Sequence, residues 1–299
     1  IKTDPIPHEM RPLGMVYMVD MFKSFITTMM NDRLQEIAQQ PNAPFLGGSM
    51  GFSPLTTSAD ATLFAVGAKD GESSQSFHAL LMEIEKMRRF GFTEAELERA
   101  KTNYLRRLER AAENAGDRRN AELVYPMISH FADNEPILDP AYELEVAKGY
   151  MPFIQLEQLN QIAAQVITEE NRIVLLNSPA REGLAIPTAE ELQAIMDSVE
   201  EMELEAYEEE VSDQPLVDVA TLVPGKITKE ASGVFGSTVW TLSNGIQVVV
   251  KPTDYRKDEV LFSLKSDGGH SIIPEDLLPS VEGNVFGLWV QSSGVGEFN

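Results

Sequence analysis

The stretch FTEAELERAK, residues 92–101, contains the clearest helix start in the chain. Thr93 and Glu96 have the spacing of a capping box, in which the threonine hydroxyl accepts from the glutamate amide and the glutamate carboxylate accepts from the threonine amide. Glutamates fill the first turn and arginines follow toward the other end, and both signs of charge suit the helix dipole. The sequence therefore predicts a helix that begins after Thr93 and ends or turns near Gly116.

Apolar periodicity extends this layer upstream. Residues 74–90 and 19–38 carry apolar side chains at spacings of three and four, which predicts two helices, and Gly91 is the expected stop of the later one. Two runs rich in aromatic and branched residues, 42–55 and 61–68, are typical of strands, with glycines that indicate edges or bulges.

Further helices and one more strand are expected downstream. The helices are predicted at 119–132, 140–150, 154–166 and 188–202, and the continuous apolar run RIVLL at 172–176 indicates a buried strand. Elements in this order are typical of α+β or α/β layers. We predict an α+β fold, with a mixed or antiparallel sheet covered by helices.

A change of composition follows this domain. Seven of the eleven residues 200–210 are glutamate, which we interpret as an exposed helix end that runs into a linker. Asn244-Gly245 then separates two apolar runs, 239–242 and 246–250, and predicts a β-hairpin. A third strand is expected at 259–264, before a turn at Asp267-Gly268-Gly269 and a helix near 274–278. This is only the beginning of a large domain, so we expect the chain to be a fragment of a longer protein.

Composition excludes several classes of function. The 299 residues include 47 acidic and 24 basic ones, for a net charge of −23. This balance disfavours nucleic acids and anionic membranes as partners, since both attract basic surfaces. The absence of cysteine excludes disulfides, cysteine-ligated zinc, iron–sulfur clusters and thiol catalysis. No apolar run reaches the roughly 18 residues that a membrane helix needs.

The histidines do not form a zinc peptidase motif. Such a site needs two histidines and a glutamate on one helix, as H-E-x-x-H or H-x-x-E-H. Neither spacing occurs at any of the four histidines, His8, His78, His130 and His270. We expect His78 beside the buried stripe of its helix and the others in solvent, with His130 and Asp133 as a weak alternative metal pair. The sequence therefore predicts no catalytic residue and no metal ligand in this chain.

Two other motifs could be read as binding sites, but a purely structural interpretation is favoured for each. The glycine-rich residues 47–51 lack the G-K-[ST] of a phosphate loop, so an edge strand or bulge is favoured. The glutamate run could bind calcium loosely, but it lacks the residue pattern of a calcium loop.

Three stretches resemble the insulinase/pitrilysin family of zinc metallopeptidases. Residues 92–101 look like a signature of the non-catalytic domain that follows the catalytic one, and residues 31–37, NDRLQEI, resemble the end of that domain's first helix. Residues 241–249, TLSNGIQVV, are similar to the hairpin with which each half of these enzymes begins. The structural signature residues of this resemblance are Thr93, Glu96, Asn244 and Gly245.

The resemblance implies a domain order. Residues 1–205 would be the second, non-catalytic domain, with a fold like that of mitochondrial processing peptidase. Residues 206–232 would be an acidic hinge, and residues 233–299 the N-terminal part of a third domain, a truncated second copy of the fold that is catalytic-like but lacks zinc ligands. The family's zinc site lies in its first domain, so the resemblance transfers no catalytic residue to this chain.

The function that the resemblance implies is that of an internal, non-catalytic segment of a zinc metalloendopeptidase. The segment would form the wall and hinge of a peptide-degrading chamber and would bind no zinc, which belongs to the parent protein. The expected partners are peptide or unfolded protein substrates and the remaining domains, with no nucleic acid and no membrane span in this segment. Similarity to large bacterial members favours the periplasm or cell envelope.

Two alternatives stay open. The parent protein could be a catalytically inactive family member that acts as a structural or partner subunit, and an H-x-x-E-H motif upstream of Ile1 would distinguish the two. The chain could also be a binding module unrelated to peptidases, which would have a compact second domain that ends near Asn299.

Overall fold

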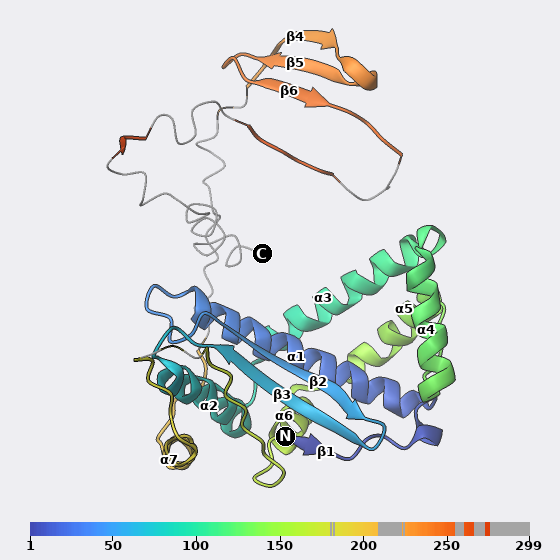
Figure 1. Ribbon diagram of the computed structural model, residues 1–299. Coiled ribbons are helices and arrows are strands. Elements are labelled where there is room, and N and C mark those ends of the chain that lie inside the picture. Colours follow the sequence, from blue (N-terminus) through green and yellow to red (C-terminus); the bar gives the residue numbers. More distant parts are fainter. Residues whose placement is uncertain are drawn as a thin grey trace. The chain divides into compact units, whose positions relative to one another are not determined.

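A computed structural model describes residues 1–179, 181, 183–208, 223, 225–254, 260–265 and 273–275. The chain divides into two compact units, Ile1–Glu208 and Glu209–Asn299. Figure 1 shows the first unit as helices around one sheet and the second as a small separate sheet. Each unit is described by itself.

The sheet of the first unit has three antiparallel strands in the order β1-β3-β2. Strands β2 (Gly47–Thr56) and β3 (Ala59–Gly67) form a hairpin, and β1 (Lys2–Thr3) pairs with the other edge of β3. Gly48 on β2 permits a helix to approach closely, because a Cβ atom there would lie 3.1 Å from the Cβ of Leu34. The glycine-rich stretch is thus part of a strand, as predicted.

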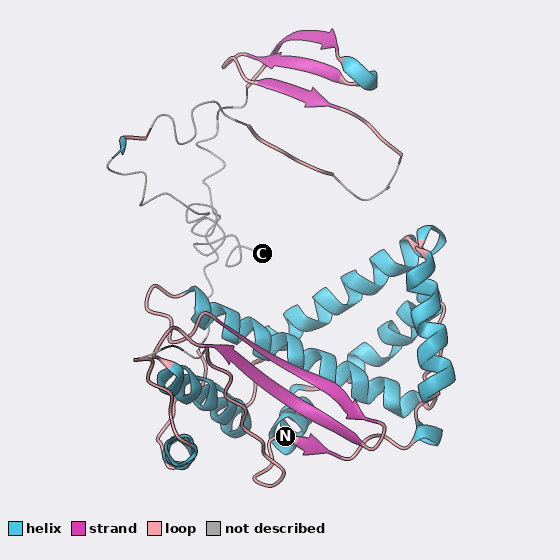
Figure 2. Cartoon of the chain, viewed as in Figure 1, coloured by secondary structure: helices cyan, strands magenta, loops and turns pink. Residues whose placement is uncertain are grey.

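Helices pack behind this sheet and beyond its ends, as Figures 1 and 2 show. Helix α1 runs along it, α2 and α7 lie toward one end, and α3, α4 and α5 gather toward the other. The helices are α1 (Gly14–Gln39), α2 (Ser73–Phe90), α3 (Glu94–Glu113), α4 (Asn120–Asp133), α5 (Pro140–Tyr150), α6 (Leu156–Gln165) and α7 (Ala189–Glu200). Short 3-10 turns lie at His8–Met10, Ala115–Asp117, Met151–Phe153 and Val234–Gly236. The helices predicted in the first unit are confirmed, with α1 beginning earlier than expected.

The core of the first unit lies between α1, the sheet and the helices α2, α3 and α6. Its members are apolar residues that repeat along the inner faces of these elements, as the periodicity predicts. The most completely buried ones are Met21, Phe25, Ile26, Met29, Met30, Leu34, Phe45, Met87, Leu97 and Leu159. Within the described part of the chain, no helix is long and apolar enough to cross a membrane.

The prediction of a buried strand at 172–176 is wrong. Ile173 and Leu175 are 70% and 90% exposed, and no ladder pairs this segment with another strand among the described residues. The amide of Lys2 donates to the carbonyl of Asn171, so the segment begins beside β1. Because β1 is only two residues long, it offers no further backbone partner, and an apolar run without a partner strand cannot form a sheet.

The second unit contains an antiparallel sheet in the order β4-β5-β6. Strand β4 (Ile227–Ser232) lies inside the stretch expected as a linker, and it pairs with β5 (Thr238–Leu242). The predicted hairpin between β5 and β6 (Gln247–Val250) is confirmed. Its turn places Gly245 at φ 88°, a conformation that favours glycine.

The expected third strand of this unit is not observed. The described residues 260–264 have no strand assignment, and Val260 and Leu261 are 92% and 86% exposed. Residue 259, the predicted turn at 267–269 and most of the predicted helix at 274–278 lie outside the described residues.

Candidate functional site

The described residues contain no group of three or more histidine, aspartate or glutamate side chains that could hold a metal ion. His130 is exposed, and its Nδ1 atom lies 2.7 Å from the carbonyl oxygen of Glu135. Asp133 instead pairs with Arg11 at 3.2 Å. The donors of the alternative metal pair therefore have other partners. The donor set of the described residues does not fit a zinc site, and His270 lies outside them.

The first unit has a buried polar centre where α1 meets α3. Arg33 on α1 donates from Nε and Nη2 to the two carboxylate oxygens of Glu96, at 2.6 and 2.9 Å. The two residues are only 2% and 3% exposed. Such a two-point pair is geometrically specific, and burial makes each charge depend on the other. Together Arg33 and Glu96 fix the orientation of α3 against α1.

Glu96 also completes the capping box of α3. Its Oε2 atom accepts from the Thr93 amide at 2.7 Å, and the Thr93 hydroxyl accepts from the Glu96 amide at 3.3 Å. The predicted capping box is therefore confirmed. One carboxylate serves both the helix start and the buried arginine, so residues 31–37 and 92–101 meet at this point.

The loop between α2 and α3 is tied to the same centre. Arg33 donates from Nη2 to the Gly91 carbonyl at 3.0 Å. Asn160 on α6 accepts from the Phe92 amide at 2.8 Å and donates to the Phe92 carbonyl at 3.1 Å. A Cβ atom at Gly91 would lie 2.3 Å from Asn160, so glycine is required for this close packing. Three helices are thus joined through backbone groups of one short turn.

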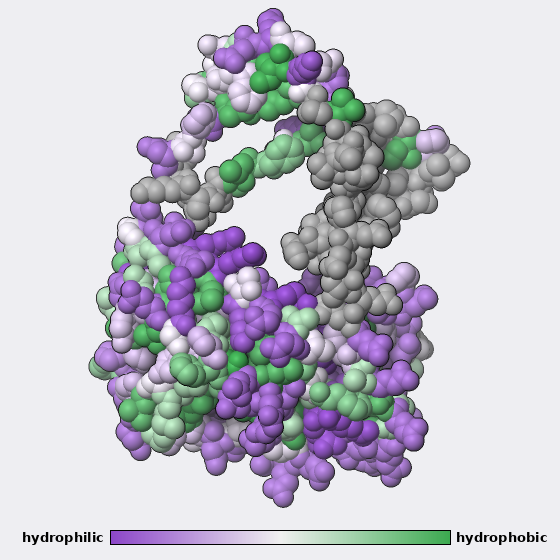
Figure 3. Space-filling model, turned by 180° about the vertical axis from the view of Figure 1, so that it is seen from behind, coloured by the Kyte–Doolittle hydropathy of each residue, from purple (hydrophilic) through white to green (hydrophobic). Residues whose placement is uncertain are grey.

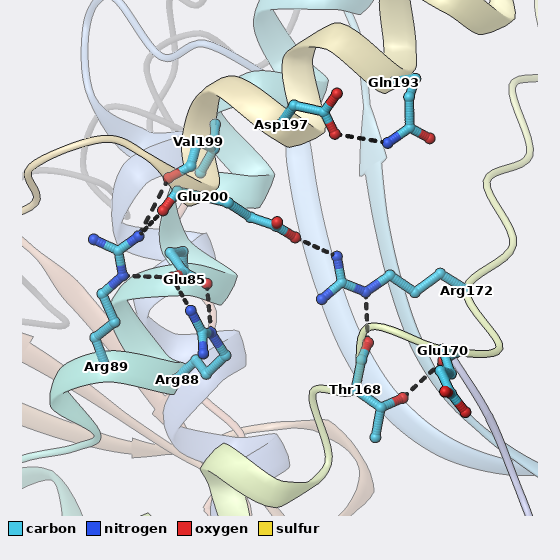
Figure 4. Close-up of polar contacts among 10 residues, drawn as sticks. All are labelled: Glu85, Arg88, Arg89, Thr168, Glu170, Arg172, Gln193, Asp197, Val199 and Glu200. Carbon is cyan, nitrogen blue, oxygen red and sulfur yellow. Dashed lines mark hydrogen bonds and ion pairs between the residues drawn. The ribbon is translucent and has the colours of Figure 1, made fainter.

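A second network fastens the end of α7 to α2, as Figure 4 shows. Arg89 donates to the carbonyl oxygens of Glu200 and Met202 at 2.6 and 2.7 Å. These carbonyls belong to the helix end, where no amide of the helix itself is available. Arg172 donates to the Glu200 carboxylate at 2.8 Å. Two arginines therefore hold the beginning of the glutamate-rich stretch that starts at Glu200, here called the acidic segment.

Glu85 orients the two arginines at the end of α2, Arg88 and Arg89. It accepts from Arg88 at 2.7 Å and also pairs with Arg89. Burial alone would raise the pKa of Glu85, but the hydrogen bonds from Arg88 and Arg89 outweigh it and lower the pKa. A carboxyl group with a lowered pKa in the folded state stabilises the protein above its unfolded pKa. That contribution is lost as the pH falls through the folded value.

We expect Glu85→Gln to lower the free energy of unfolding by about 1 to 2 kcal/mol at pH 7, because hydrogen bonds to a charged acceptor are lost while the partly exposed arginines remain hydrated. The difference from the wild-type chain should shrink as the pH falls below 4.5, where the glutamate of the unfolded chain becomes protonated. Urea unfolding followed by circular dichroism at several pH values measures both effects. Glu113→Gln, at an exposed position, is the control, and an equal loss at pH 7 and pH 3 would contradict the prediction.

The acidic segment makes one more contact with the polar centre. The ring of Tyr207 lies 4.3 Å from the guanidinium carbon of Arg33, and the Phe92 ring lies 4.7 Å from the same carbon. The Tyr207 hydroxyl donates to the Glu36 carboxylate at 2.6 Å. The segment that leaves α7 is therefore fastened at both ends of its described part.

Apolar side chains also reach the surface of the first unit. Figure 3 shows hydrophobic patches between hydrophilic ones on one face of the molecule. On α4, Tyr125, Ile128 and Phe131 are 69%, 54% and 93% exposed. The other side of α4 borders a groove that α1, α3 and the β2–β3 hairpin also line.

Of the predicted signature residues, Thr93 and Glu96 lie in the polar centre, while Asn244 and Gly245 form the β5–β6 turn of the second unit. The sequence analysis missed Arg33 as the partner of Glu96. A signal was present, since Arg33 follows Met29 by four residues and Met30 by three, and so lies on the apolar stripe of α1. A lone charge on such a stripe indicates a buried partner.

Comparison with known proteins finds two relatives that are named as a zinc protease and a probable zinc protease. The chain is 28% identical over 198 residues to "Zinc protease PQQL-like" of Arabidopsis thaliana, which covers 64% of this chain and 20% of that protein. It is 22% identical over 290 residues to "Probable zinc protease PqqL" of Escherichia coli (strain K12), which covers 92% of this chain and 30% of that protein. No family model matches. The chain thus spans less than a third of the length of these relatives.

Solved structures share the fold. The periplasmic protease PqqL from Escherichia coli matches with a TM-score of 0.60 and 20% identity, over 85% of this chain and 28% of that one. A predicted insulinase family protease from Yersinia pestis matches with a TM-score of 0.56 and 12% identity, over 67% of this chain and 42% of that one. The mixed arrangement of helices and antiparallel sheets is therefore that of peptidase domains of this type.

Proposed function

We propose that this chain, an insulinase-like polypeptide related to zinc proteases, is a non-catalytic segment of a zinc metalloendopeptidase. In this proposal it forms part of the wall and the hinge of a chamber that degrades peptides. The observation that carries the proposal is the likeness to the Escherichia coli PqqL protein across 92% of the chain. Zinc and the catalytic residues belong to other parts of the parent protein.

The contacts of the acidic segment support the hinge assignment. A hinge needs a firmly held element on each side, and the network around Arg89 holds the end of α7 on the first unit. The domain order that we propose follows the prediction from the sequence except at the end of the hinge. That prediction has residues 1–205 as the second domain, 206–232 as the hinge and 233–299 as the start of a third, ligand-less copy of a fold like that of mitochondrial processing peptidase. Strand β4 makes residues 227–232 part of the second unit's sheet, so the hinge would end before Ile227.

The parent protein is proposed to act on peptides or unfolded proteins in the bacterial periplasm or cell envelope. The net charge of −23 favours basic substrates over acidic ones. The periplasmic location is proposed by analogy with the Escherichia coli relative, which is a periplasmic protease.

Metal content and peptidase activity, measured on this chain and on the longer parent protein, test the proposal. We expect the chain alone to contain no stoichiometric zinc and to cleave no fluorogenic peptide, while the parent protein contains zinc and loses activity with a chelator. Stoichiometric zinc with chelator-sensitive activity in the chain would contradict its non-catalytic role. A parent protein without zinc and without activity would instead favour a structural or partner subunit.

A further inference from the structure

We infer that Tyr207 is a releasable latch that fastens the acidic segment to α1 and covers the buried pair of Arg33 and Glu96. With the latch closed, the described part of the acidic segment is packed on the first unit as far as Tyr207. With the latch open, the segment is held only at the end of α7. The latch therefore decides whether residues 203–208 are held on the first unit.

The contacts of Tyr207 join it to two residues on one face of α1. Its hydroxyl donates to Glu36 at 2.6 Å, and its ring lies 4.3 Å from the Arg33 guanidinium carbon. Arg33 and Glu36 are three residues apart, so they are neighbours on the helix surface. A single tyrosine thus makes a charge-assisted hydrogen bond and a cation–π contact with the same helix.

The rings of Tyr207 and Phe92 both pack against the guanidinium group of Arg33 and help to bury it. Phe92 lies against the guanidinium 4.7 Å away, and Arg33 as a whole is only 2% exposed. Tyr207 itself is half-buried, and the glutamates Glu203, Glu205 and Glu208 around it are exposed. The segment is therefore held at the tyrosine, while its acidic side chains stay in water.

One unsatisfied donor makes the latch releasable. The Nη1 atom of Arg33 is buried and has no hydrogen-bond partner in the described part of the molecule. A buried donor without a partner is costly, and access to water removes that cost. Departure of Tyr207 would admit water to Nη1, so the loss of the tyrosine contacts is partly offset. This inference depends only on contacts within the first unit and not on the proposed peptidase function.

A nitroxide label tests the latch in the full chain. The chain has no cysteine, so Ala206→Cys gives a single labelling site beside Tyr207. We expect the electron paramagnetic resonance spectrum of this label to be mainly immobilised, and to become mainly mobile when Tyr207→Ala is added. Tyr207→Phe should raise the mobile fraction about fivefold, because it removes the hydrogen bond and keeps the ring.

Two controls make the result decisive. Tyr125→Ala, at a tyrosine that is 69% exposed, should leave the spectrum unchanged. A label at Ala194→Cys on α7 should stay equally ordered with and without Tyr207→Ala. An immobile label at residue 206 in the Tyr207→Ala chain would overturn the latch, and so would equal loosening of the label on α7.

Substitutions at both ends of the hydrogen bond give a test that does not require Tyr207→Ala to fold. Glu36→Gln and Tyr207→Phe act on the same bond, so each should mobilise the label, and the double variant should add little to either. Full additivity of the two effects, or no effect of either, would overturn the role of this bond.

Discussion

Glu96→Gln is expected to lower the free energy of unfolding of the first unit by about 3 to 5 kcal/mol. The substitution keeps the shape of the side chain and an acceptor for the capping box, but it leaves the Arg33 charge buried and uncompensated. Urea unfolding followed at 222 nm by circular dichroism measures the loss, because every α-helix of the described residues lies in the first unit. Neither tryptophan of the chain lies in residues 1–208, so tryptophan fluorescence reports separately on the second unit.

The matched control is Glu98→Gln on the same helix. Glu98 pairs with Lys101 at 2.8 Å, but its side chain is 61% exposed, so the change should be within about 0.5 kcal/mol of neutral. A similar loss at Glu98 and Glu96 would show that removal of any glutamate from α3 matters, and not the buried pair.

A double-mutant cycle measures how strongly the contributions of Arg33 and Glu96 to stability depend on each other. Arg33→Met alone leaves the Glu96 carboxylate buried without its cation, and Glu96→Gln alone leaves the opposite charge. With both substitutions neither charge is buried, so the combined loss should be smaller than the sum of the single losses. Simple additivity would contradict the interpretation of Arg33 and Glu96 as mutually dependent charges.

Local signals predicted the helices well. The predicted capping box at Thr93 is confirmed at the start of α3, and the helix predicted from Thr188 begins with a second capping box, that of α7. Gly91 ends α2 at φ 70°, as its position after the apolar stripe predicts. These predictions hold because the hydrogen bonds and the cap of a helix are all made within one stretch of sequence.

Strand pairing could not be predicted in the same way. The runs at 172–176 and 259–264 have the composition of strands, yet residues 172–176 and 260–264 lack a ladder and expose apolar side chains. A strand depends on the edge that another segment offers, and periodicity contains no information about that edge. The partner of Glu96 could not be predicted for the same reason. Arg33 lies far from Glu96 in the sequence, and only the packing of α1 against α3 brings them together.

Gly91→Ala is expected to cost about 2 to 5 kcal/mol, the second large effect at the polar centre. Gly91 has φ 70° and ψ −152°, a conformation that is strained for any residue with a Cβ atom. The added Cβ would also lie 2.3 to 2.5 Å from atoms of the Asn160 side chain, which holds the Phe92 backbone. The turn would have to move, and with it the Gly91 carbonyl that accepts from Arg33. Urea unfolding at 222 nm again measures the loss.

Gly71 provides the control for backbone strain alone. It has φ 78° but no atom within 4 Å of an added Cβ, so Gly71→Ala should cost only about 1 kcal/mol. The extra loss at Gly91 contains the contact with Asn160 together with the strain of its ψ of −152°. In an Asn160→Ala background Gly91→Ala should therefore cost less than it does in the wild-type chain. If both glycines gave the same loss, strain would account for the whole effect, and the close packing of Asn160 against the turn would contribute nothing to the assembly of α1, α3 and α6.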